Sequence, residues 1–442
     1  MPASAAPVRA WMKPPAAIDM VAALLFCAGV AQWVTLTRDA GDLRVWILAA
    51  FALASLSAAV RLVWDRRWLR VPLLVLAVML AVGWARALGT HTADTHFAGA
   101  SLGILWMALV GRHAVTPARL MLAVLLFFAL ALPALLVGMS GIPTFFPPET
   151  YGPVTGDPEM MRRALATAGA TEVNQNALAA LVLIVAPIAV ATLWLRGGRS
   201  PLRIAIQILG VIAFLGGGWI LAVTRSDTAL MAVAGLLLVI LMRADRLRWR
   251  VAAGMLLAAM PAAAAAWIYR ASRERAMEAM GSFHYTLLDR VDVLGFAWRI
   301  WLDDFWLGIG LNDFRHVYAA SKESVRGAAH AHNFFLQTGL DVGVIGLVAY
   351  CLVLAFLLVR AHQVLRERSG IAPAVAGGAA ASLILVHLFG LTDAVALGAK
   401  IGLLQWMAAG LILAAWQLKA VESVEEPAAV PAVVATDDVP RP

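Results

Sequence analysis

Residues 120–138 read LMLAVLLFFALALPALLVG and include no charged side chain. A helix that crosses a bilayer needs about 20 mainly apolar residues, so this run is long enough for one crossing. Over all 442 residues, 62% are hydrophobic and only 14% are charged, and the mean hydropathy is +0.81. These values lie far outside the range of soluble globular proteins. We therefore expect an integral membrane protein.

Comparable apolar runs recur along the whole chain and leave no room for a separate soluble domain. They lie at residues 17–36, 45–63, 71–88, 96–111, 117–138, 175–195, 202–223, 227–242, 251–268, 333–359, 374–391 and 401–418. The pattern predicts an all-α integral membrane protein with about twelve transmembrane helices. We expect residues 1–418 to form a single polytopic membrane domain, and 419–442 to be a disordered cytoplasmic tail.

The basic residues predict the orientation of the spans. With the N-terminus inside, five short inner loops hold 16 basic residues, against 7 in the short outer segments. Because positive residues gather in cytoplasmic loops, both termini should be cytoplasmic. The same rule accounts for the net charge of +8, so no nucleic-acid partner is needed to explain it.

Two outer segments are much longer than the other connections. Residues 139–174 are rich in proline and glycine, and residues 269–332 separate spans 9 and 10. Long connections in a compact protein are usually functional. The second segment carries apolar residues at helical spacing, namely Leu287, Val291, Leu294, Trp298, Trp301 and Phe305. We expect this periplasmic loop to be partly helical, with a helix that lies on the membrane surface or roofs the bundle.

Ionisable residues at the outer ends of spans are the first candidates for chemistry, because a charge held there is costly unless it is paired or used. Arg225, Arg290 and His332 stand out, with Asn176 and Lys400 as weaker candidates. The alternative interpretations are structural. Arg225 would be an interfacial anchor paired with Asp227, and His332 would cap the helix that follows it.

His332 precedes an apolar run that begins at Phe334, so its imidazole should lie near the positive end of a helix dipole. That position favours the neutral ring, which can accept a proton from a hydroxyl nucleophile. His330 would share the site only if this segment is extended, since two helical steps rotate a side chain by about 200°. We see no outer cluster of His, Asp and Glu with ligand spacing, so no metal is expected.

The arginines suit a substrate that carries phosphate. Guanidinium groups stay charged and bind phosphate oxygens in a bidentate manner, so they could hold a pyrophosphate leaving group. Arg290 and Arg299 are nine residues apart, which places them on opposite faces of one helix. We therefore expect only one of the two to face the site.

A set of motifs in this order resembles the O-antigen ligase and polymerase superfamily. The matching residues are Thr224-Arg225-Ser226, then Arg290 upstream of Gly308-Ile309-Gly310, then His332-Asn333, then Gly343-Val344-Ile345-Gly346. Each motif is short, and the ordered set is the specific feature. The family's Ser-Arg-Gly stands here as Thr-Arg-Ser, with the arginine kept.

The resemblance implies a glycosyltransferase of the inner membrane of Gram-negative bacteria, with its active site facing the periplasm. It implies that O-antigen polysaccharide passes from undecaprenyl pyrophosphate to a sugar hydroxyl of lipid A-core, with inversion and without metal or other cofactor. In that scheme His332 is the base and Arg225 and Arg290 bind the pyrophosphate. Asn333, His330, Arg299, Asn176 and Lys400 are possible supporting residues.

Other activities fit the same motifs. An O-antigen polymerase or an O-linked oligosaccharyltransferase would use the same donor, and we favour the ligase because one outer loop dominates and precedes His332-Asn333. A secondary transporter would be expected to carry charges or broken helices near mid-membrane, and few charges lie within the predicted spans.

Overall fold

The computed structural model describes residues 67–87, 91–140, 175–193, 200–224, 287–321, 330–366, 370–393 and 400–425, together with residues 195, 229, 233, 328, 397 and 398. In this part of the chain every regular element is a helix. Seven of these helices are long and apolar enough to cross a membrane. They are α3 (Arg67–Arg86), α5 (Pro117–Ser140), α7 (Gln175–Leu193), α8 (Pro201–Thr224), α13 (Phe334–Leu365), α14 (Ile371–Phe389) and α15 (Lys400–Glu425). The prediction of an all-α, multi-pass membrane protein is confirmed.

Eight of the twelve predicted runs correspond to described helices, the eighth being α4 (His91–His113). The predicted spans at 17–36, 45–63 and 251–268 lie outside the described residues, as does 227–242 apart from two positions. The total of twelve spans and the cytoplasmic placement of both termini therefore stay predictions. Helix α15 continues to Glu425, whereas we expected the tail to begin at residue 419.

The helices pack into one bundle through small residues and present apolar side chains outward. Gly103 on α4 lies against the ring of Trp406 on α15, where a Cβ atom would not fit. A small residue at a helix contact of this kind is typical of helices packed in a bilayer. The outward sides of α3 and α8 expose large apolar side chains, among them Val71, Leu74, Val78, Ile208, Ile212 and Leu215. These apolar surfaces are suited to contact with lipid tails.

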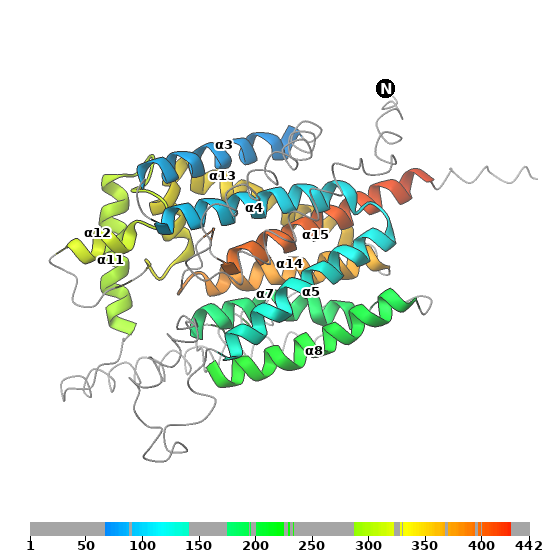
Figure 1. Cartoon of the computed structure of the whole chain (residues 1–442). Helices are drawn as coiled ribbons and strands as arrows, with labels where there is room; N and C mark the ends of the chain where they lie inside the picture. Colours follow the sequence, from blue (N-terminus) through cyan, green and yellow to red (C-terminus); the bar gives the residue numbers. More distant parts are fainter. Residues whose placement is uncertain are drawn as a thin grey trace, which may run out of the picture.

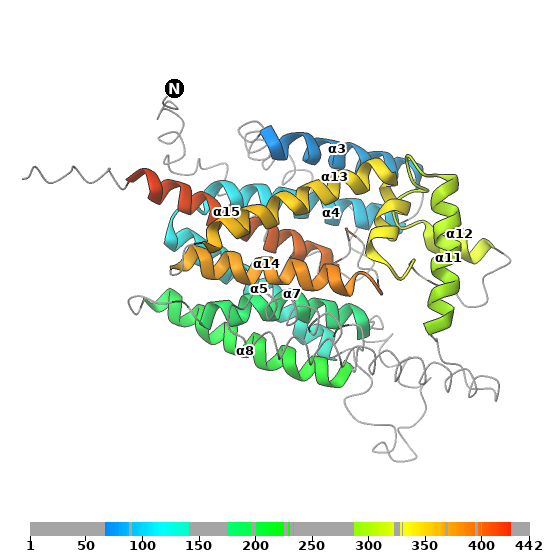
Figure 2. The ribbon, with the colours of Figure 1, turned by 180° about the vertical axis from the view of Figure 1, so that it is seen from behind.

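Two helices of the long loop gather at one end of the bundle. Figures 1 and 2 show α11 (Leu287–Asp303) and α12 (Phe314–Ala320) there, with α11 running across the direction of the bundle helices. Helices α3, α8 and α14 end at the same end, and α13 and α15 begin there. An ion pair of 2.6 Å between Arg86 and Asp304 joins the end of α3 to the segment after α11. Residues far apart in the sequence therefore meet at this end.

Helix α11 confirms the helix predicted in the long loop, and one side of it packs against neighbouring elements. The packed side consists of Val293, Phe296, Ala297 and Trp301, which contact α12 and the first turns of α13. Val291 and Trp298, both in the predicted stripe, are instead exposed. Contact with α12 and α13 therefore decides which apolar residues of α11 are buried.

Helix α13 is broken at Gly343, where φ is +67°. The segment that follows α11 packs against this break. A Cβ atom on Gly343 would collide with the carbonyl of Trp306. The Val344 N–H donates to the Phe305 carbonyl at 2.9 Å, and the Ile309 N–H donates to the Leu340 carbonyl at 2.7 Å. Backbone groups freed by a break in a membrane helix must find such partners within the protein. Gly308 of the Gly-x-Gly therefore packs directly against the backbone of Gly339 and Gly343 in α13.

Candidate active site

The turn before α13 is fixed by Asn333, which caps the helix. Its side chain accepts a hydrogen bond from the Leu336 N–H at 2.9 Å and donates to the Leu391 carbonyl at 3.0 Å. The Phe334 N–H donates to the Gly390 carbonyl at 2.6 Å. The start of α13 is thus bound to the turn that follows α14. Because Asn333 is the cap, the interpretation of His332 as the capping residue is wrong.

His330 and His332 lie side by side. Their ring centroids are 4.4 Å apart in an edge-to-face arrangement, and the His332 N–H donates to His330 Nδ1 at 3.4 Å. This is possible because the segment is a turn: His332 has φ +51°, in the left-handed region. Histidine tolerates that region better than most side chains do, yet it is a strained conformation. The segment is a turn and not the extended chain that we expected to be needed, yet it brings both imidazoles to one site.

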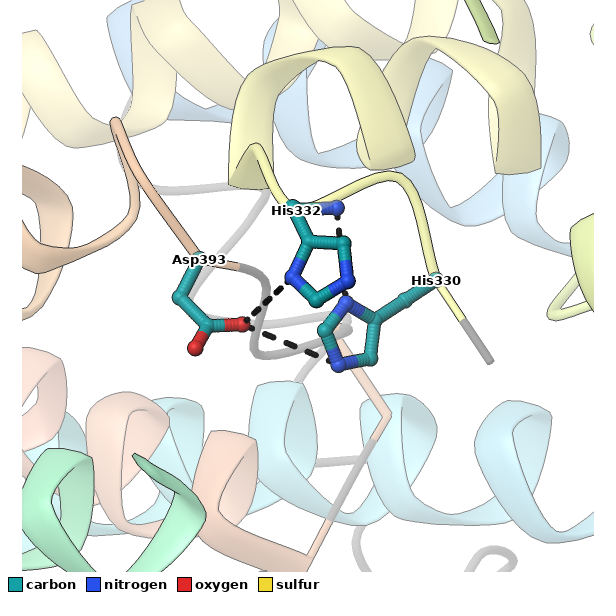
Figure 3. A group of neighbouring side chains, drawn as sticks. All are labelled: His330, His332 and Asp393. Atoms are coloured by element: carbon teal, nitrogen blue, oxygen red, sulfur yellow. Dashed lines mark hydrogen bonds and ion pairs between the residues drawn. The ribbon is translucent and has the colours of Figure 1, made fainter. Parts of the chain in front are cut away.

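Asp393 completes the cluster and was not singled out from the sequence. It follows α14, its side chain is buried, and its Oδ1 atom lies 3.6 Å from His332 Nδ1 and 3.7 Å from His330 Nε2. Figure 3 shows both contacts converging on one carboxylate oxygen. A distance of 61 residues along the chain separates Asp393 from His332, so no local spacing could reveal the pair.

The charges in the cluster follow from burial and from these neighbours. Burial alone would raise the pKa of Asp393, but the hydrogen-bonding contact of His332 and the charges of the two histidines and Arg290 lower it below the ordinary value. Burial lowers the pKa of His330 to about 4, and the effect of Asp393 in the opposite direction is smaller. Near pH 7 the cluster therefore holds an ionised carboxylate beside a neutral His330.

Arg290 reaches the turn that carries Asp393. From α11 its guanidinium donates to the Thr392 carbonyl at 3.3 Å. Arg299 lies nine residues further along α11 with an exposed side chain. The two arginines thus occupy opposite faces, as expected, and Arg290 is the one that faces the cluster.

The other predicted site residues are not brought to this cluster by the described structure. Arg225 lies outside the described residues, although α8 ends immediately before it, at the end of the bundle that carries α11. Asn176 is half-buried in the first turn of α7. Lys400 begins α15, and its side chain lies outside the described part.

The geometry of His332 suits proton transfer. Asp393 faces Nδ1, so the neutral tautomer with its proton on Nδ1 leaves a lone pair on Nε2. A carboxylate in this position also stabilises the imidazolium that forms once Nε2 takes a proton. The arrangement is that of an orienting carboxylate behind a general base.

The same three side chains form a possible metal-binding group, which corrects the expectation that no such cluster exists. Ligand atoms of His330, His332 and Asp393 all lie within 4.8 Å of one another. Two imidazoles and one carboxylate are a ligand set found at catalytic zinc sites. The residues therefore fit either a proton-transfer site or a divalent ion, and the two uses exclude each other because both need the histidine lone pairs.

Comparison with known proteins gives a match to a protein family. No curated protein matches the chain. A family match covers the end of α8, the whole long loop and the first half of α13, and so includes Arg225, Arg290 and His332 but not Asp393. Residues 211–351 match the family described as O-antigen ligase, and this match supports membership of the chain in the O-antigen ligase and polymerase superfamily.

Proposed function

We propose that this protein is an O-antigen ligase. It transfers O-antigen polysaccharide from undecaprenyl pyrophosphate to a sugar hydroxyl of lipid A-core, in the periplasmic leaflet of the inner membrane, and so completes lipopolysaccharide. The observation that carries the proposal is the contact of His332 with Asp393 at 3.6 Å, beside the turn to which Arg290 donates. A base and a phosphate-binding cation thus lie together at one end of the bundle.

His332 is the base in this mechanism. Its Nε2 atom takes the proton of the acceptor hydroxyl while the hydroxyl oxygen bonds to the anomeric carbon of the donor. Asp393 holds the ring and stabilises the positive charge that the ring acquires. Attack comes from the side opposite the pyrophosphate, so the configuration at the anomeric carbon inverts.

Arg290 and Arg225 act on the leaving group. As the bond between the anomeric carbon and the phosphate oxygen breaks, its electron pair goes to the undecaprenyl pyrophosphate. Planar guanidinium groups bind the resulting charge through paired hydrogen bonds. The ordinary role of a metal ion in pyrophosphate departure is thereby taken by fixed cations, and we propose that transfer is metal-independent.

A reconstituted reaction tests the proposal. Purified protein, a lipid-linked glycan and lipopolysaccharide that lacks O-antigen are combined, and the products are separated by size. A glycan ladder attached to lipopolysaccharide supports the ligase. Lengthening of the glycan on its lipid carrier supports the polymerase instead, and transfer to a protein serine supports the oligosaccharyltransferase. With no covalent product from any acceptor, the enzyme assignment fails and a transporter becomes the better hypothesis.

The same reaction in excess chelator decides between the two uses of the histidine cluster. We expect an unchanged rate, because His332 needs both of its nitrogen atoms for the roles given above. Loss of activity that a divalent ion restores would assign His330, His332 and Asp393 to a metal.

A further inference from the structure

A buried chain of hydrogen bonds runs from the histidine turn to the segment that follows α11. The Ala331 N–H donates to Gln337 Oε1 at 2.9 Å, and Gln337 Nε2 donates to Asp341 Oδ1 at 2.8 Å. The Asn312 N–H donates to the same Asp341 oxygen at 3.0 Å. Gln337 and Asp341 are one helical turn apart on α13, and their side chains are only 1% and 2% exposed. These hydrogen bonds therefore join the turn before α13 to the segment after α11, through two buried side chains of α13.

Both ends of this chain adjoin strained backbone. His332, which follows Ala331, has φ +51°, and Asn312 has φ +53°. These are the positive values found at non-glycine positions in the described residues. A side chain in the left-handed region persists only where its surroundings hold it there. The N–H of Asn312 itself, and the N–H of Ala331 next to His332, make hydrogen bonds to Asp341 and Gln337 that supply this restraint.

The burial of the polar residues Gln337 and Asp341 in an apolar helix requires an explanation. An amide and a carboxyl group inside an apolar helix bundle cost free energy relative to well-packed apolar side chains. One use of such a pair is to fix a single arrangement of the segments that it joins. Here the joined segments are the turn that carries His332 and the segment that continues from α11, the helix of Arg290.

We propose that Gln337 and Asp341 are positioning residues for glycan transfer, which hold His332 in place relative to Asp393 and relative to the α11 segment. The proposal rests on the proposed function. Neither side chain contacts the histidine rings, and Gln337 acts through the Ala331 backbone. Asp341 fixes the orientation of the Gln337 amide, because its oxygen accepts from Nε2 and so directs Oε1 toward Ala331.

The donor and acceptor pattern allows a swap experiment. Gln337→Glu removes the donor to Asp341 and sets two carboxyl groups side by side, where both cannot ionise readily. Asp341→Asn keeps an oxygen that can accept from both of its partners. The double variant Gln337→Glu with Asp341→Asn restores one donor and one acceptor between the two side chains. Thr338→Val is the matched control, since Thr338 is equally buried on α13 but bonds only to Phe334 of its own helix.

We expect the kcat of Gln337→Leu and Gln337→Glu to fall by up to about 100-fold, which is what a displacement of about 1 Å at a reacting group can cost. The KM for the lipid-linked donor should stay within about twofold, because the phosphate-binding arginines are unchanged. Asp341→Asn should keep most of the rate, Asp341→Leu should lose it, and the double variant should regain most of what Gln337→Glu loses.

Hydrogen exchange of the Ala331 amide supplies a readout that does not depend on activity. Losing its acceptor should speed exchange of this amide by up to about 10-fold in Gln337→Leu, while amides of α15 stay unchanged. Unchanged exchange at Ala331, or a kcat for Gln337→Leu equal to that of Thr338→Val, would overturn the positioning role.

If Gln337→Leu does not fold, Gln337→Glu and the double variant carry the test. If the wild-type protein transfers no glycan, the exchange measurement still decides whether the chain restrains the histidine turn, so the two failures are distinguishable.

Discussion

His332 and Asp393 should respond differently to substitution, because one is proposed to take the proton and the other to orient the ring. His332→Ala should lower the transfer rate by about 10² to 10⁴, the usual contribution of a general base. Asp393→Asn should cost at least about 10-fold, and up to the roughly 10⁴-fold that follows replacement of a triad carboxylate. Rates are compared at equal amounts of folded, membrane-inserted protein.

His330→Ala is the matched control, since it removes the neighbouring imidazole and leaves the pair of His332 with Asp393. We expect a smaller loss than for His332→Ala, although the two rings touch. If His332→Asn transferred glycan within a few-fold of the wild-type rate, the role of base would be wrong.

The pH profile should identify the base within the cluster. The pKa of Asp393 lies below its ordinary value, so this carboxylate is ionised from pH 5 to 8. The pKa of His330 is lowered to about 4, so its ring is neutral over the same range. A fall in kcat/KM as the pH drops from 8 to 5 would therefore come from neither group, and is the profile expected of a reaction that uses a histidine as general base.

This decline should persist in His330→Gln, because His330 does not titrate in that range. A flat profile between pH 5 and 8 for the wild-type enzyme would argue against a histidine base.

Arg290 should not tolerate lysine, although the charge is kept. Lysine cannot offer the planar pair of donors that binds two phosphate oxygens at once. Arg290→Lys should therefore lose most activity, and we expect the same of Arg225→Lys. Arg299→Lys serves as the control on the exposed face of α11 and should keep its activity. Equal rates for Arg290→Lys and Arg299→Lys would show that pyrophosphate clamping is the wrong role for Arg290.

At the scale of the elements, the path of α13 depends on the backbone conformation of one residue, Gly343. Gly343 holds a left-handed conformation, and a methyl group there would also collide with the Trp306 carbonyl. Gly343→Ala should therefore destabilise the protein by more than the about 1–3 kcal/mol that the conformation alone costs an L-residue. The apparent unfolding temperature in detergent should fall, and transfer should fall with it because the segment after α11 is displaced.

Gly295 on α11 is the matched control for this substitution. A methyl group at this exposed helical position meets nothing within 4 Å. Gly295→Ala should be neutral or stabilise by up to about 1 kcal/mol, since alanine favours a helix over glycine. An unfolding temperature for Gly343→Ala that equals that of Gly295→Ala would show that the break in α13 is not required.

For the whole molecule, the orientation in the membrane is the prediction on which the proposed function depends. Reporter fusions after Arg67, Arg199, Arg246 and Arg366 should report the cytoplasm, and fusions near Gly152 and Lys322 should report the periplasm. The described structure is compatible with this arrangement, because α13 begins at the end of the bundle that carries α11 and finishes at the opposite end. A cytoplasmic signal near Lys322 would separate the proposed site from a periplasmic substrate.

The sequence predicted the helices but not the contacts between them. Eight apolar runs became helices whose bounds lie within seven residues of those expected, because length and hydropathy suffice to specify a membrane helix. The apolar stripe predicted on α11 includes Trp301, which is buried, but also Val291 and Trp298, which are exposed. Periodicity could not identify which face would contact α12 and α13.

The sequence by itself determined the membrane class, the helical architecture and the candidate residues His332, Arg290 and Asn333, because local composition and motif order carry that information. Only the tertiary structure decided that Asn333, rather than His332, caps α13, and that Arg290, rather than Arg299, faces the cluster. It also decided that Asp393 lies against two histidines some sixty residues earlier in the chain. The physical reason is that contacts between segments depend on how α11, α13 and α14 pack, and packing brings together side chains that no local spacing relates.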